Sequence, residues 1–154
     1  SHLFFNMYVL YMFGNNIESA FNYHFGNLGT VLYLTLYIGA VIAATIPAML
    51  KHKDNYYYNS IGASGAVSAL VFAGIIFYPT AGYGILFIPI SIPAFIFGPL
   101  YLLMENYLDK RGGTNVAHDA HIWGAIFGFI FPILIKPSLA LNFITQIASY
   151  ISSF

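Results

Sequence analysis

The sequence contains no cysteine and very little charge. Without cysteine, disulfide bonds, thiolate metal sites and a cysteine nucleophile are excluded. Charged side chains make up 6% of the 154 residues, whereas a soluble domain carries about 25%. The net charge is +0, which argues against nucleic-acid binding, where a basic surface supplies most of the affinity, so we expect no nucleic-acid partner.

Apolar residues take the place of the missing charges. Hydrophobic side chains make up 59% of the chain and aromatic side chains 19%. So few polar groups cannot coat a water-soluble body of this size, and lipid must therefore cover the rest. We predict an all-α fold, a polytopic helix bundle in the lipid bilayer with about five transmembrane helices in one domain over residues 1–154.

Several apolar stretches are long enough to be predicted as membrane crossings. They cover residues 3–13, continued by a half-polar stretch to 25, and residues 31–50, 64–78, 85–104 and 120–135. Prolines at 89, 93 and 99 interrupt the fourth crossing, which we expect to be bent. The charged stretches 51–55 and 105–115 are predicted to be hydrated loops, and the tail, 139–154, is an interfacial helix or a partial crossing.

Ser64 is a candidate nucleophile at the start of the third apolar stretch. As a helix, that stretch spans about 22 Å, less than the ~30 Å of hydrocarbon, so its serine end lies below the surface, packed in protein or lining a water-filled cavity. Backbone N–H groups and the positive end of the helix dipole could stabilise an oxyanion there. The alternative is a helix-capping serine. The soluble-hydrolase pattern G-x-S-x-G is not met, because position 66 is alanine.

His121 is the candidate general base, at the start of the last crossing. Gly124 and Gly128 follow on the same helical face and form a G-x-x-x-G pair, which lets another helix approach closely. The helix opened by Ser64 offers a matching ridge of small residues at positions 65, 69 and 73. Packing of the two ridges would bring His121 within reach of the Ser64 hydroxyl proton. Taken alone, a histidine at the start of a crossing is more often an interfacial or packed residue.

Polar side chains near the starts of three crossings are expected to converge. Successive crossings alternate in direction, so the first, third and fifth all begin at one membrane face. His2, Asn6, Ser64 and His121 lie near those starts. His2 and Asn6 are four residues apart and share a helical face, where polar groups at membrane depth are usually functional.

No acidic partner for His121 is apparent in the sequence. Asp119 lies two positions away and points elsewhere on a helix, and Asp109 belongs to a predicted loop. We therefore predict a Ser–His dyad rather than a triad. His118 and His121 could share a metal ion, but a catalytic zinc site usually has three protein ligands and the sequence places no third. We expect no metal and no cofactor.

Together these motifs resemble those of the rhomboid family of intramembrane serine proteases. Residues 62–65, Gly-Ala-Ser-Gly, match the family's G-x-S-G around the nucleophile. Ala120 and His121 with the two glycines that follow match its A-H-x-x-G-x-x-x-G around the base. His2 and Asn6 match its H-x-x-x-N on the second transmembrane helix, and Glu18 fits the structural glutamate that closes that helix. The match covers essentially the whole chain.

The resemblance implies a serine endopeptidase that cleaves transmembrane segments of membrane proteins without a cofactor. Ser64 would attack the peptide carbonyl, and His121 would act as base and then as acid. Asn6, His2 and the Ser64 backbone N–H would hold the oxyanion. The resemblance also assigns residues 85–104 to a lateral gate and places the active site on the extracytoplasmic or lumenal side.

The chain departs from the family pattern at two points. The family core has six helices and this chain begins at the second, so we expect the first helix and the loop after it to be absent. Many members also carry a tyrosine four residues after the nucleophile, packed on the histidine. Ser68 stands there, so His121 must be held in another way.

Two indications conflict on how the chain is oriented in the membrane. The basic residues on the active-site face are Lys51, Lys53, Lys110 and Arg111, and only Lys136 lies on the other face. Positive-inside counting would therefore place the site in the cytoplasm, against the family's arrangement. We follow the family, since the segment expected before residue 1 can hold the deciding charges.

The sequence leaves two rival functions. One is a catalytically inactive rhomboid-like membrane protein that binds transmembrane segments; such relatives usually lack the serine or the histidine, and this chain keeps both. The other is a small channel or transporter lined by His2, Asn6 and His121, which predicts ion flux and no covalent labelling of the serine.

Overall fold

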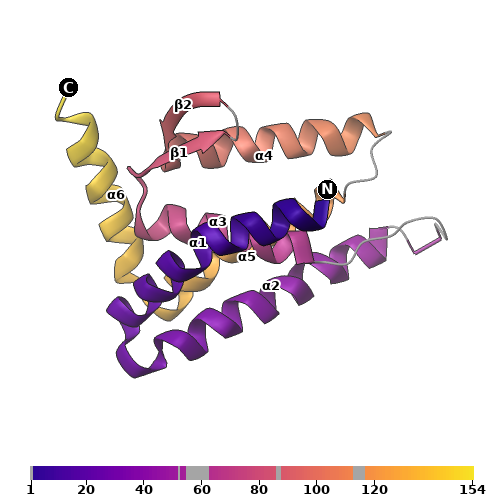
Figure 1. The fold of residues 1–154 in the computed structure, drawn as a ribbon, viewed down its shortest axis with the longest axis horizontal. Coiled ribbons are helices and arrows are strands. Elements are labelled where there is room, and N and C mark those ends of the chain that lie inside the picture. The colour runs from indigo at the N-terminus through magenta and orange to yellow at the C-terminus, as the bar shows by residue number, and fades with distance from the viewer. Residues whose placement is uncertain (1, 52, 55–62, 86–87, 113–116) are drawn as a thin grey trace.

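A computed structural model describes residues 2–51, 53–54, 63–85, 88–112 and 117–154. In chain order its elements are α1 (His2–Phe25), the 3-10 helix η1 (Gly26–Leu28), α2 (Gly29–Lys51), α3 (Ala63–Phe77), β1 (Gly82–Ile85), β2 (Ile88–Pro93), α4 (Ala94–Arg111), α5 (His118–Ile135) and α6 (Ser138–Ile151). α1 and α2 fold back on each other, α3 and α5 lie side by side in the middle, and α4 runs on the other side with the hairpin at one end (Figure 1).

The first pair of helices turns at glycine. Gly26 has a φ of +59°, a conformation that glycine adopts readily, and the chain reverses there from α1 into α2. Glu18 lies near the end of α1, and its Oε1 atom accepts a hydrogen bond of 2.9 Å from the Thr30 hydroxyl of α2. This contact links the two helices across the turn, as expected of a structural glutamate.

α3 is the central helix of the bundle. Its residues from Gly65 to Phe77 are buried, except for the partly exposed Val71. It packs on α1, α2 and α5, and more lightly on α4 and α6. This apolar helix is therefore surrounded mainly by other helices rather than by lipid. The first turn of α3, which holds Ser64, is therefore fixed relative to the helices around it.

α3 and α5 approach so closely that their backbones touch. The Gly65 carbonyl lies against Gly124 and the Ala69 carbonyl against Gly128, so neither α5 glycine has room for a Cβ atom. These two helices make the most extensive contact between elements in the part of the chain that the structure describes. The predicted packing of the two small-residue ridges is confirmed.

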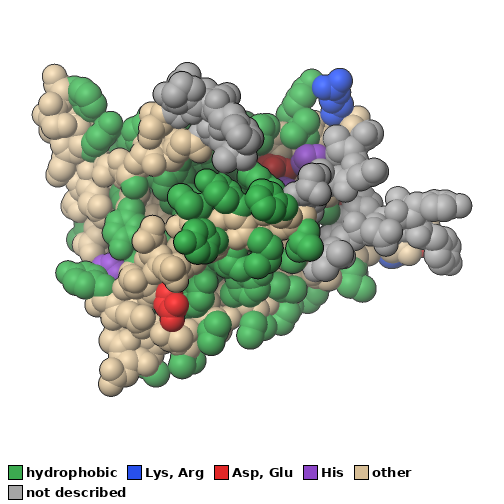
Figure 2. All heavy atoms as spheres, viewed as in Figure 1, with side chains coloured by type: hydrophobic (Ala, Val, Ile, Leu, Met, Phe, Trp, Pro, Cys, Tyr) green, Lys and Arg blue, Asp and Glu red, His purple; other side chains and the backbone are tan. Residues whose placement is uncertain are grey.

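α2 shows how the bundle meets lipid. One face carries small buried residues, Ala40, Ala44 and Ala48, at four-residue spacing. The opposite face exposes large apolar side chains, namely Val31, Leu34, Ile38, Ile42, Ile46 and Met49. An exposed apolar surface of this extent fits hydrocarbon better than water, and apolar side chains also cover much of the face seen in Figure 2.

The lengths of the helices also indicate a membrane environment. Two of the described segments are long and apolar enough to cross a membrane, namely Leu3–Lys51 and His118–Ile135. The first of them folds into α1, η1 and α2. α3 and α6 are shorter apolar helices. The predicted all-α membrane bundle is confirmed, and the crossings predicted at 3–25, 31–50, 64–78 and 120–135 correspond to α1, α2, α3 and α5.

The predicted crossing at 85–104 is wrong in its first half. Residues 82–93 instead contribute the antiparallel strands β1 and β2, with Tyr83 opposite Ile92, and α4 begins only at Ala94. Proline has no N–H and is disfavoured in a helix interior, so Pro89 and Pro93 prevent an earlier start. The Ala94 N–H bonds to the Ala81 carbonyl at 2.9 Å and thereby joins α4 to the turn before β1. The gate assigned to 85–104 is therefore no single bent helix.

The loop predicted at 105–115 is also shorter than expected. α4 continues through Glu105 to Arg111, and Glu105 is buried, with 5% of its surface exposed. The charges that indicated a hydrated loop belong to the last turn of this helix, where Lys110 and Arg111 are exposed. Residues 113–116 lie outside the described part of the chain.

The tail forms α6, which packs on α3 and α5. Leu139 is buried in the main core, and Phe143 packs against it with its ring edge-on to Phe129. At 14 residues α6 is about 21 Å long, too short to cross the ~30 Å hydrocarbon layer. This length excludes a complete crossing and is compatible with both predicted alternatives, an interfacial helix and a partial crossing.

Replacing Gly128 by alanine should lower the free energy of unfolding by about 1–3 kcal/mol, because the added methyl group collides with the Ala69 carbonyl. Thermal unfolding of the detergent-solubilised protein, followed by circular dichroism, measures the change. Gly84→Ala is the matched control, since a Cβ atom there meets nothing within 4 Å. Equal unfolding temperatures for the two variants would contradict the backbone contact.

Candidate functional site

Ser64 lies in the first turn of α3 and is half-buried. The backbone N–H groups of a first turn have no partner within their own helix, and they carry the positive end of the helix dipole. Gly62, which completes the predicted G-x-S-G motif, lies outside the described residues. The serine hydroxyl is thus placed beside donors suited to a developing negative charge.

His121 lies in the first turn of α5, with 12% of its side chain exposed. The residue before it, Ala120, places its carbonyl against Gly65, the residue after Ser64. The immediate sequence neighbours of Ser64 and His121 are therefore in contact. Both side chains line the same cavity, as the packing of the two ridges predicts.

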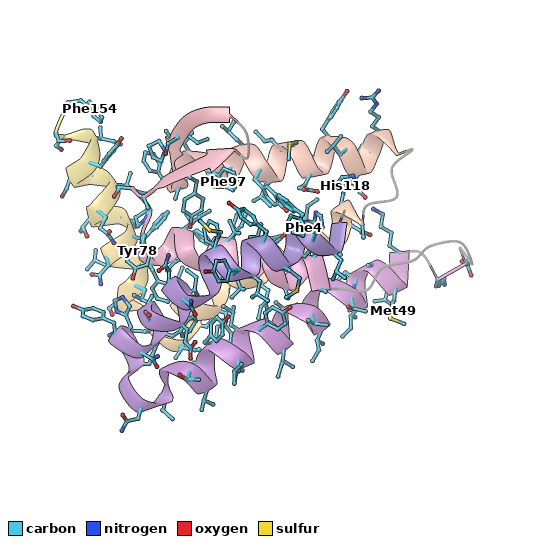
Figure 3. The ribbon with its side chains drawn as sticks, in the orientation of Figure 1. Phe4, Met49, Tyr78, Phe97, His118 and Phe154 are labelled. Carbon is cyan, nitrogen blue, oxygen red and sulfur yellow. The ribbon has the colours of Figure 1, made fainter. Side chains whose placement is uncertain are left out.

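That cavity has a volume of about 510 Å³ and lies between α1, α3, α4, α5 and the hairpin. Its walls are mostly apolar; Phe97 of α4 is one lining residue and lies on the side of α4 that faces α1 (Figure 3). Among the described residues that line it, those with polar side-chain groups are Asn6, Ser64, Ser68, Tyr83, Tyr101, Glu105 and His121. An apolar cavity with a few converging polar groups is the usual form of a binding or active site.

Asn6 joins the cavity from α1, where it is half-buried. Three of the four predicted site residues, Asn6, Ser64 and His121, are thus brought together from three separate helices. His2 begins α1, but its side chain lies outside the described part of the structure. Its predicted place in the oxyanion site stays a prediction.

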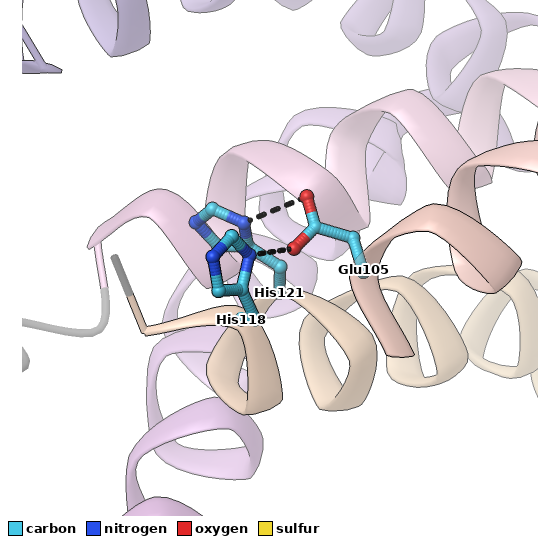
Figure 4. Close-up of side chains that lie close together, drawn as sticks. All are labelled: Glu105, His118 and His121. Atoms are coloured by element: carbon cyan, nitrogen blue, oxygen red, sulfur yellow. Dashed lines mark hydrogen bonds and ion pairs between the residues drawn. The ribbon is translucent and has the colours of Figure 1, made fainter. Parts of the chain in front are cut away.

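Glu105 is the site residue that the sequence did not reveal. Its Oε2 atom lies 2.6 Å from Nδ1 of His118, and its Oε1 atom lies 3.2 Å from Nδ1 of His121 (Figure 4). The expectation that no carboxylate accompanies His121 is therefore wrong. Glu105 reaches the histidines because α4 extends beyond Met104, and an acidic residue directly after an apolar run was the signal that could have indicated it.

The same three residues could hold a metal ion. The potential ligand atoms of Glu105, His118 and His121 all lie within 4.8 Å of one another. From the sequence, the two histidines lack a third ligand; the structure supplies one from α4.

Ser68 lies one turn after Ser64, the predicted nucleophile, at the position where the resemblance leads one to expect tyrosine. Its hydroxyl is 2.9 Å from the hydroxyl of Tyr101, which comes from α4. A tyrosine is therefore present at this level of the cavity, on a different helix. His121 itself is held by Glu105, which answers how it is fixed without the usual aromatic neighbour.

A second polar cluster ties three helix ends together beside the site. Lys51, at the end of α2, lies 2.6 Å from Asp109 of α4 and 3.7 Å from Asp119 of α5. Asp119 also accepts a hydrogen bond of 2.8 Å from the backbone N–H of Ala120. As predicted, Asp119 points away from His121, and it braces the turn on which that histidine lies.

Comparison with known proteins gives a consistent family. The Rhomboid domain family model matches residues 1–138. RHOMBOID-like protein 12, mitochondrial, of Arabidopsis thaliana is 35% identical over 141 residues, which cover 80% of this chain and 39% of that protein. Presenilin-associated rhomboid-like protein A, mitochondrial, of Danio rerio is 31% identical over 129 residues, covering 82% of this chain and 32% of that protein.

The chain thus spans well under half the length of these curated relatives. No solved structure matches it at a comparable level of significance. The family model covers most of the chain, and it includes the helices that carry Asn6, Ser64, Glu105 and His121. This membrane protein belongs to the rhomboid family.

Proposed function

We propose that this chain is an intramembrane serine endopeptidase that cleaves transmembrane segments of membrane-protein substrates. The observation that supports this most strongly is that Ser64, His121 and Asn6 line the same apolar cavity. Family membership supports the same function. No cofactor is needed for the reaction.

The reaction would begin with attack of the Ser64 hydroxyl oxygen on a substrate peptide carbonyl. His121 takes the hydroxyl proton as base and then gives it to the leaving amine as acid. The Ser64 backbone N–H and the side chains of Asn6 and His2 would stabilise the oxyanion. Water then hydrolyses the acyl-enzyme and restores the serine.

Glu105 would act as a positioning residue for His121. Its carboxylate lies next to Nδ1 of the imidazole, so the ring presents Nε2 as the base. A carboxylate in this position fixes the tautomer and stabilises the imidazolium that forms during catalysis. The proposed machinery is therefore a Ser–His pair with an orienting glutamate.

The proposed reaction takes place within the bilayer, where the substrate segment also lies. The apolar cavity walls suit a transmembrane segment whose peptide bond is presented to Ser64. Following the family's arrangement, we place the active site on the extracytoplasmic or lumenal side. The mitochondrial relatives extend the proposal to a mitochondrial membrane.

A fluorophosphonate probe should label the detergent-solubilised wild-type protein, because an activated serine attacks the probe's phosphorus. Ser64→Ala removes the nucleophile and His121→Ala removes the base, so both variants should be unlabelled. Gel fluorescence measures the labelling, and thermal unfolding checks the fold of each variant. A folded wild type without label would instead support a catalytically inactive protein that binds transmembrane segments.

Asn6→Ala should lower kcat for a transmembrane substrate by about 10²–10³-fold, since one oxyanion donor is lost. Asn16→Ala is the matched control, because Asn16 lies on the same helix and is exposed. Cleavage is followed by the appearance of product on a gel. Near-normal turnover by Asn6→Ala, with its fold intact, would refute the assignment.

Glu105→Gln should lower kcat by at least about tenfold. A positioned general base contributes a rate enhancement of about 10²–10⁴-fold, and the variant should lose part of it. KM should stay near its wild-type value, because Glu105 orients His121 and is not proposed to bind substrate. Glu18→Gln, on the opposite side of the bundle, keeps a hydrogen-bond acceptor and should leave kcat unchanged. If Glu105→Gln lost only thermal stability and kept its kcat, Glu105 would be purely structural.

A further inference from the structure

We propose that Glu105, His118 and His121 form a binding site for a zinc-type divalent cation, and that the bound cation switches off His121. The regulatory half of this inference rests on the proposed protease function. The binding half stands on the geometry of the three side chains and is independent of any catalysis.

The three ligands are presented by two elements that are already fixed against each other. His118 and His121 lie three residues apart in the first turn of α5, so they share a face of the helix. Glu105 reaches them from α4, and its two carboxylate oxygens lie 2.6 Å and 3.2 Å from the two Nδ1 atoms. Both imidazole rings thus direct a nitrogen at the same carboxylate (Figure 4).

The donor set fits zinc better than magnesium or calcium. Two imidazole nitrogens and one carboxylate form a ligand set found at catalytic zinc sites, whereas magnesium and calcium prefer oxygen ligands. The ligand atoms lie within 4.8 Å of one another. Because Zn–N and Zn–O bonds are about 2.0–2.2 Å long, side-chain rotations that bring the most distant pair to about 4 Å would let one cation contact all three. Little reorganisation of the helices is needed.

The site also has a route for the ion and room for a fourth ligand. Glu105 and His121 both line the 510 Å³ cavity, so a water molecule can complete a tetrahedral shell from that side. The turn that carries the histidines is braced by Asp119, which bonds to the Ala120 N–H and lies 3.7 Å from Lys51. Support of this kind keeps ligands oriented for a metal.

Occupancy would remove the general base. A neutral imidazole has one N–H and one nitrogen with a free lone pair. When Nδ1 of His121 gives its lone pair to the cation, the ring proton must reside on Nε2. That atom then donates a hydrogen bond and cannot accept the Ser64 proton. The same histidine therefore serves either the serine or the metal.

Zinc binding is measured first on Ser64→Ala, which cannot turn over. Equilibrium dialysis of this protein in detergent against Zn²⁺, with metal analysis, should give one ion per chain. Adding His118→Gln should weaken binding at least about tenfold, since even outer-shell partners are typically worth that much. Adding His24→Gln is the matched control, because His24 lies at the far end of α1. Glu105→Gln gives a second ligand variant in case His118→Gln fails to fold.

The switch is then measured by fluorophosphonate labelling of the chain with Ser64 in place. Zinc should abolish labelling and EDTA should restore it, whereas zinc should not change the level of labelling that the His118→Gln variant shows. No stoichiometric binding, or equal affinity in the His118→Gln and His24→Gln variants, would overturn the site. Full labelling at saturating zinc would overturn the switch. A wild type unlabelled without zinc would refute the protease proposal alone, since the dialysis result still decides the metal site.

Discussion

The backbone contact between α3 and α5 is the constraint on which the rest of the structure depends. Because Gly65 and Gly124 leave no gap, the first turns of the two helices lie at the same level, and these are the turns that carry Ser64 and His121. α1 then adds Asn6 and α4 adds Glu105 to the cavity beside them. The smallest residues in the bundle thus determine where its polar ones meet.

Polar contacts anchor both ends of α4. At one end its first N–H groups bond to carbonyls of the turn before β1, and at the other Glu105 and Asp109 pair with residues of α5 and α2. Its contact with α3 between these points is slight, and the cavity lies there. Glu105 could not be buried alone, because an unpaired carboxylate in a low-dielectric interior is costly, so the two histidines stabilise both its charge and the position of the helix.

The sequence predicted the features that depend on composition and spacing, and it failed where tertiary contacts decide. Apolar length located α1, α2, α3 and α5, and glycine spacing predicted the approach of α5 to α3. The apolar pattern of the stretch before Ala94 fits a helix and a strand equally well, and only its prolines favour the hairpin. Glu105 was missed because local charge indicated a loop, whereas its partners His118 and His121 lie on the next helix and nothing local to Glu105 points to them.

A more general consequence follows from α2, because the side chains on its two faces differ in size but hardly in polarity. Beyond the buried Leu36, alanines face the neighbouring helices, whereas leucine, isoleucine, valine and methionine face outward. A plot of polarity along such a helix cannot tell inside from outside, but a plot of side-chain volume can. The outer face can therefore exchange one bulky apolar residue for another during evolution at little cost, while a larger side chain on the inner face would overpack the contact with a neighbouring helix.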